Sequence, residues 1–113
     1  MSKERNLCDI IEKLEAFEER LGVRIEAHSA WCESHYDEYE LFVGGELHAE
    51  NGNTLKQSIT VVADAYNSSN QLLATESHLI DSLTLLGFET FMIWIQRLPH
   101  DKIAKIRVYP KPA

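Results

Sequence analysis

The stretch from residue 58 to residue 96 constrains the fold more than any other part of the chain. It is made of short runs rich in β-branched and aromatic residues, and polar residues that favour turns close each run. In the first run, Ile59, Val61 and Ala63 would share one strand face. The NSSN sequence at 67–70 then predicts a tight hairpin turn, because these side chains bond the local backbone and Asn tolerates the left-handed conformation.

The last run of this stretch, Phe88 to Gln96, is apolar at most positions on both of its faces. A strand of this kind is either covered on both sides or uses its outer face to meet another molecule. Trp94 is therefore a candidate interaction residue.

The flanking segments carry the same kind of pattern. Residues 23–32 alternate as a half-buried strand, residues 40–50 form the next strand before an Asn-Gly turn signal at 51–52, and a last strand covers 103–109. No crossover helices separate these strands, so antiparallel pairing in two packed sheets is expected. The predicted fold is mainly β: residues 23–113 form an immunoglobulin-like antiparallel β-sandwich of about six to seven strands, joined to one N-terminal α-helix.

The N-terminal segment, residues 1–22, has a helical period. Ser2 can cap a helix that runs to about Arg20, and Gly22 can end it in the left-handed conformation. Apolar residues recur at three-and-four spacing and form a stripe: Leu7, Ile10, Ile11, Leu14, Phe17 and Leu21. The stripe also fits two heptads of a coiled-coil seam, so it predicts either packing on the chain's own domain or pairing with a second copy.

Charge and composition narrow the classes of partner. The net charge is −7 and no basic cluster is present, which argues against binding to nucleic acid or to an anionic membrane surface. No apolar run approaches the roughly 20 residues that span a bilayer, and the first residues lack the apolar core of a signal peptide. A cytoplasmic location is expected, with Cys8 and Cys32 both reduced.

His28, Cys32 and His35 are the best candidates for metal binding or thiol chemistry. Nitrogen and thiolate ligands suit zinc, and His35 could act as a base toward the Cys32 thiol. On an extended strand, however, His28 and Cys32 lie about 13 Å apart, too far to share one ion. We therefore expect no metal, no cofactor and no catalytic residue. Similarly, Glu46, His48 and Glu50 share a strand face that is predicted to be a solvated surface rather than an acid–base site.

One family resemblance adds to this picture. From Gly45 to Phe91 the order of residues, with ITVVADAYN at 59–67 and NQLL at 70–73, resembles the FxLYD domain family. Of the family's namesake positions only Tyr66 is kept, and the family's usual Pro-Gly is here Leu86-Gly87. The resemblance implies a small β-sandwich without an established catalytic activity.

Taken together, the sequence predicts a non-catalytic interaction or assembly module that associates with itself, most simply as a homodimer. The predicted interaction residues lie on the helical stripe and on the last strand of the central stretch: Leu7, Ile10, Leu14, Phe17, Leu21 and Trp94. The alternative is a metal-binding or thiol-dependent protein that uses His28, Cys32 and His35.

Overall fold

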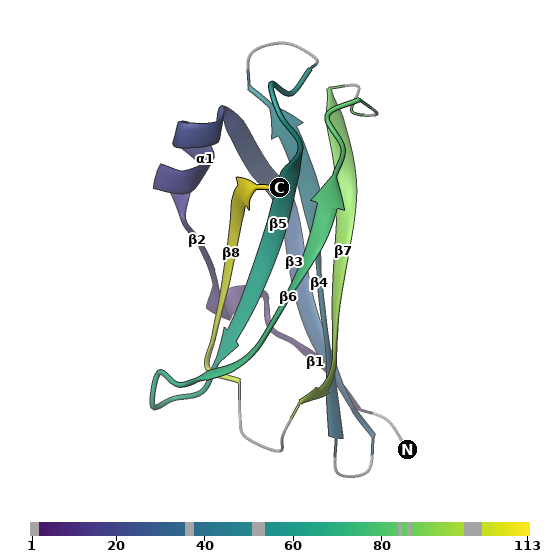
Figure 1. Ribbon diagram of the computed structural model, residues 1–113. Coiled ribbons are helices and arrows are strands. Elements are labelled where there is room, and N and C mark those ends of the chain that lie inside the picture. Colours follow the sequence, from purple (N-terminus) through teal and green to yellow (C-terminus); the bar gives the residue numbers. More distant parts are fainter. Residues whose placement is uncertain (1–2, 36–37, 51–53, 84, 86, 99–102) are drawn as a thin grey trace.

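The chain folds into a β-sandwich of two sheets, as the sequence predicted (Figure 1). The computed structural model describes residues 3–35, 38–50, 54–83, 85, 87–98 and 103–113. Within these residues the first sheet contains four strands in the order β1 (Lys3–Asn6), β3 (Val23–His35), β4 (Glu38–Ala49) and β7 (Phe88–Leu98). The facing sheet has the order β2 (Ile11–Lys13), β8 (Lys105–Pro112), β5 (Ile59–Tyr66) and β6 (Leu72–Ile80). The immunoglobulin-like assignment, which is finer, stays a prediction.

The core fills the space between the two sheets. Inward-facing side chains alternate along β3, β4, β5, β7 and β8 and are almost completely buried: Val23, Ile25, Leu41, Val43, Leu47, Val61, Ala63, Phe91, Ile93, Ile106 and Val108. Gly45 is required here, because a Cβ at this position would lie 2.9 Å from the Phe91 ring. The neighbouring strand β3 bulges between Glu26 and Ser29.

The hairpin between β5 and β6 is confirmed. Asn70 adopts the left-handed conformation at φ 63°, and the side-chain oxygen of Asn67 accepts hydrogen bonds from the backbone of Ser69 and Gln71, both at 3.0 Å. Another predicted feature, the Asn-Gly turn at 51–52, lies outside the described residues.

The N-terminal helix was predicted too long. Helix α1 spans only Glu15–Leu21, and the residues before it form β1, a short 3₁₀ helix (Cys8–Ile10) and β2. Tertiary contacts override the helical period: the Leu7 backbone N–H donates to the carbonyl of Ala30 at 2.8 Å, and the Leu7 side chain is only 2% exposed within the core. The predicted end of the helix is correct, since Gly22 has φ 68° and its N–H bonds the last helical carbonyls.

This N-terminal segment also corrects the expectation of purely antiparallel pairing. β2 pairs with β8 in parallel, with Ile11 beside Ile106 and Lys13 beside Val108. The chain contributes β1 to the first sheet and then crosses through the 3₁₀ helix to the facing sheet, so residues 3–13 stabilise both layers. In the described part of the chain, no helix combines the length and apolar character needed to cross a membrane.

Candidate interaction surface

The outer face of the first sheet carries a row of three stacked rings, which we call the aromatic row: Trp31, Phe42 and Trp94. They come from β3, β4 and β7 and stand directly opposite one another in the strand register. The Trp31 and Phe42 ring centroids are 5.1 Å apart, and those of Phe42 and Trp94 are 6.0 Å apart, with interplanar angles of 12° and 7°. Because the rings stack face to face across strands, Trp94 on the outermost strand is the open end of the row.

A second row of side chains crosses the same face and meets β7 at Phe88, six residues before Trp94. It contains Arg24, His48 and Phe88, again in direct register, and the His48 ring stacks on Phe88 with centroids 5.1 Å apart. We call it the imidazole row. Like the aromatic row, it ends on β7 with a half-exposed ring.

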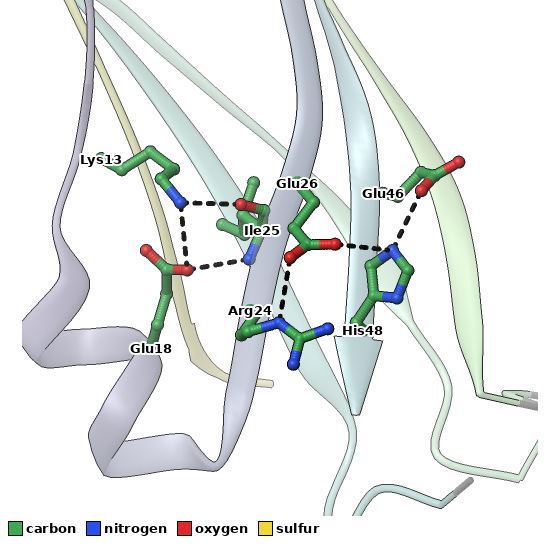
Figure 2. A network of polar contacts seen from close by, with 7 residues as sticks. All are labelled: Lys13, Glu18, Arg24, Ile25, Glu26, Glu46 and His48. Atoms are coloured by element: carbon green, nitrogen blue, oxygen red, sulfur yellow. Dashed lines mark hydrogen bonds and ion pairs between the residues drawn. The ribbon is translucent and has the colours of Figure 1, made fainter. Parts of the chain in front are cut away.

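Two carboxylates hold the imidazole row in place (Figure 2). The Nε2 atom of His48 lies 2.9 Å from Glu46 Oε1 and 3.6 Å from Glu26 Oε2, and Arg24 Nε donates to Glu26 Oε1 at 3.1 Å. Glu26 and Glu46 are directly opposite in the register, so His48 and Arg24 offset the repulsion of a like-charged cross-strand pair. The Arg24–Glu26 ion pair is half-exposed and contributes little to stability.

β7 is an edge strand of unusual character. It pairs with β4 and ends the first sheet, and its residues from Thr90 to Gln96 include no charge, no proline and no glycine. Its outward side chains Phe88, Met92 and Trp94 are 50%, 48% and 49% exposed. Edge strands are usually kept short or are protected by charge or proline, because their open hydrogen-bonding groups template further pairing. The opposite edge of the sheet, β1, is only four residues long.

The predicted interaction residues of the N-terminal stripe do not form a common surface. Leu7 is buried in the core, and Ile10, Ile11 and Leu21 are partly buried against it. Phe17 is 39% exposed, but its ring packs against Tyr109 at 5.6 Å and under the Arg20 guanidinium at 5.6 Å. A coiled-coil seam is not formed, since residues 3–13 are not α-helical. α1 and β2 lie on the side of the sandwich away from β7 (Figure 1).

Two of the three histidine and cysteine candidates, His28 and Cys32, have side chains that the structure describes. His28 is partly buried with an unpaired Nδ1, Cys32 is buried, and the side chain of His35 lies outside the described residues. The described side chains include no group of three or more His, Cys, Asp or Glu residues placed to hold a metal ion.

A buried carboxylate fastens α1 to the first sheet. Glu18 is 5% exposed, and its Oε1 accepts the backbone N–H of Ile25 at 2.8 Å (Figure 2). Lys13 donates to the carbonyl of Ile25 at 2.9 Å and lies 3.7 Å from the same carboxylate oxygen. The group therefore satisfies the backbone of β3 where the helix covers it, which is a structural role.

A second buried carboxylate lies on the outer face of the other sheet. The Tyr109 hydroxyl donates to Asp64 Oδ2 at 2.9 Å, and Asp64 is 8% exposed. Burial, followed by the hydrogen bond and the charge of Asp64, raises the pKa of Tyr109 to about 12.

The sequence indicated Trp94 as an interaction residue but not the stacking of Trp94 on Phe42 or of Phe88 on His48. Trp31, Phe42 and Phe88 all occupy outward positions in alternating strands, which the period of two could have indicated. Their alignment across strands depends on the register, and the bulge between Glu26 and Ser29 shifts that register in a way that no local sequence signal announced.

Comparisons with known proteins add little. No protein-family model matches the chain, and no curated protein gives a significant match. Among solved structures, the chain is similar to part of one titled "Crystal structure of putative beta-galactosidase from bacteroides fragilis", with 17% sequence identity and a TM-score of 0.48. That alignment covers 81% of this chain and 16% of the other.

Proposed function

We propose that the protein is a non-catalytic assembly module that forms a homodimer through the edge of β7. The observation that carries the proposal is the strand itself: eleven residues long, at the edge of its sheet, uncharged from Thr90 to Gln96, with three large half-exposed apolar side chains. The contact surface differs from the predicted one, because the N-terminal stripe packs largely within the chain, whereas the outward side chains of β7 are half-exposed.

The exposed apolar surface on β7 favours a partner. Completely burying a large apolar side chain contributes about 1.5 to 3 kcal/mol, so covering the exposed halves of Phe88, Met92 and Trp94 contributes roughly 2 to 4 kcal/mol per copy. Association itself costs several kcal/mol in lost freedom. Backbone hydrogen bonds between two edge strands, in addition to the apolar contact, would supply the remainder.

Charge supports a second copy of this chain as the occupant at this edge. Each copy has a net charge of −7, so two copies repel over most of their surfaces. The segment from Thr90 to Gln96 carries no charge, and it is therefore a surface along which two copies can approach without placing carboxylates together. A two-fold axis would satisfy both edges at once and would leave no open strand on that side.

The remaining predictions belong to the same proposal. No catalytic residue, metal or cofactor is assigned, and the acidic charge disfavours nucleic acid and anionic membranes as partners. The lack of an established activity in the FxLYD family, which the chain resembles, agrees with an assembly role. A cytoplasmic location stays a prediction.

The proposal is tested by the mass of the protein in solution. Light scattering at micromolar concentration is expected to give a dimer for the natural chain and a monomer for Met92→Lys, because a lysine on an edge strand disfavours pairing with a second strand. Leu79→Lys is the matched control. Leu79 is 60% exposed on the other sheet, and this variant is expected to remain a dimer. A monomeric natural chain, or a dimer that Met92→Lys leaves intact, would contradict the proposal.

A further inference from the structure

We infer a specific register for this contact: the two β7 strands pair antiparallel about a two-fold axis at Phe91, so that Trp94 of each copy stacks against the partner's Phe88. This inference rests on the proposed homodimer and goes beyond it by naming which side chains meet. Its starting point is that the aromatic row and the imidazole row both end on β7, on the same face, with half-exposed rings.

The spacing of the two row ends selects the axis. Trp94 and Phe88 are six residues apart, about 20 Å along a strand, and an antiparallel two-fold at the residue midway between them exchanges the two positions. The aromatic row of one copy then continues into the partner's imidazole row, and the same happens in the opposite direction. Each row gains the cross-strand ring that its open end lacks within one chain.

The regular part of β7 coincides with this register. From Phe88 to Ile95 the strand pairs residue for residue with β4, and an irregularity follows before Leu98. A bulge disturbs the ladder and twists the strand, so pairing across it is disfavoured. A two-fold at Phe91 uses only residues 88–94 of each copy, all within the regular stretch. A two-fold at Trp94, which would stack Trp94 on its own symmetry mate, would have to pair through the irregular segment.

Charge and side-chain size are compatible with the same register. Thr90, a small side chain, falls opposite the partner's Met92. Glu89, the one charged residue in the paired segment, falls opposite the partner's Ile93, and the two Glu89 side chains are offset by four residues, about 14 Å. This separation exceeds the Debye length of about 8 Å at physiological ionic strength, so their repulsion is largely screened.

Complementary cysteine variants test the register. Phe88→Cys and Trp94→Cys are made separately in a Cys8→Ser background, which removes the exposed native thiol and leaves the buried Cys32. In a mixture of the two variants, the new thiols face each other in the heterodimer, while the other site of that heterodimer keeps one Trp94–Phe88 ring pair. Mild oxidation is expected to give a covalent dimer rapidly in the mixture. Either variant alone should cross-link at least tenfold more slowly, because its thiols lie about 20 Å apart.

The outcomes separate this inference from the proposal on which it rests. If the natural chain is dimeric but the mixture cross-links no faster than the single variants, the register is wrong and the β7 dimer stands. Fast cross-linking of one variant alone would place the axis at that residue and would also overturn the register. A monomeric natural chain would refute both the register and the proposed β7 dimer. Circular dichroism of each variant establishes that it is folded, and both positions are half exposed, so the substitutions leave the core intact.

Discussion

Replacing Leu7 by alanine tests whether the N-terminal segment belongs to the core. Leu7 is 2% exposed and packs in the same buried cluster as Val23, Ile25 and Val108. Leu→Ala substitutions at such sites cost about 2 to 5 kcal/mol, because the transfer energy of the removed atoms is lost and a cavity remains. Domains of this size have total stabilities of about 5 to 15 kcal/mol, so the loss would be a large fraction.

Urea denaturation followed by tryptophan fluorescence measures this loss, at one fixed protein concentration so that any dimerisation contributes equally. The Leu7→Ala midpoint is expected to fall by an amount that corresponds to at least about 2 kcal/mol. Leu79→Ala is the control: Leu79 is 60% exposed, and its loss should change the free energy of unfolding by no more than about 0.5 kcal/mol. If Leu7→Ala behaves like the control, Leu7 does not lie between the sheets.

Two further predictions concern the buried carboxylates. Glu18→Ala leaves the buried backbone N–H of Ile25 without an acceptor and should lower the free energy of unfolding by about 1 to 3 kcal/mol. Glu18→Gln keeps an acceptor for this N–H, so its free energy of unfolding should fall by less. Equal losses for the two variants in urea denaturation would refute this role of Glu18. Because its pKa is raised from about 10 to about 12, Tyr109 contributes stability that is complete below pH 10 and is lost as the pH rises through 12. In an absorbance titration of tyrosinate, the step near pH 12 should therefore be absent in Tyr109→Phe. In Asp64→Asn this step should move to lower pH, because the hydrogen bond to the carboxylate and its charge are removed. An unchanged titration in both variants would contradict the contact.

The fold class could be predicted from the sequence because its signals are local. Alternating residues, the NSSN turn and the absence of crossover helices determine strands, hairpins and a two-layer architecture. The end of α1 at Gly22 could also be predicted from the sequence, since a glycine in the left-handed conformation, here at φ 68°, ends a helix by a local mechanism.

The structure of residues 3–13 could not be predicted from the sequence, because it is determined by contacts with distant parts of the chain. Leu7, Ile10 and Leu14 follow a helical period, but Leu7 gains more by entering the space between the sheets than by continuing a helix. Residues 11–13 similarly pair with β8, almost a hundred positions later in the chain. Propensity differs by tenths of a kcal/mol per residue, whereas burial of one leucine contributes more than 1 kcal/mol, so the long-range contact decides.

The candidate interaction surface could be predicted from the sequence only in part. Trp94 was identified because a strand that is apolar on both faces needs cover on its outer side. Its stacking on Phe42, and the separate stacking of Phe88 on His48, depend on which residues stand opposite each other after a bulge, and that follows only from the assembled sheet.

Hydrogen exchange along β7 tests the central proposal most directly. As an edge strand of a monomer, β7 has backbone amides that face solvent, and these exchange rapidly; in a strand-paired dimer the same amides are hydrogen-bonded and protected. Exchange should be measured residue by residue at protein concentrations above and below the dissociation midpoint found by light scattering. We predict that protection of outward-facing amides between Phe88 and Trp94 rises with concentration, while β5 and β8, in the other sheet, are unchanged. Equal exchange of the β7 amides at all concentrations would contradict the account.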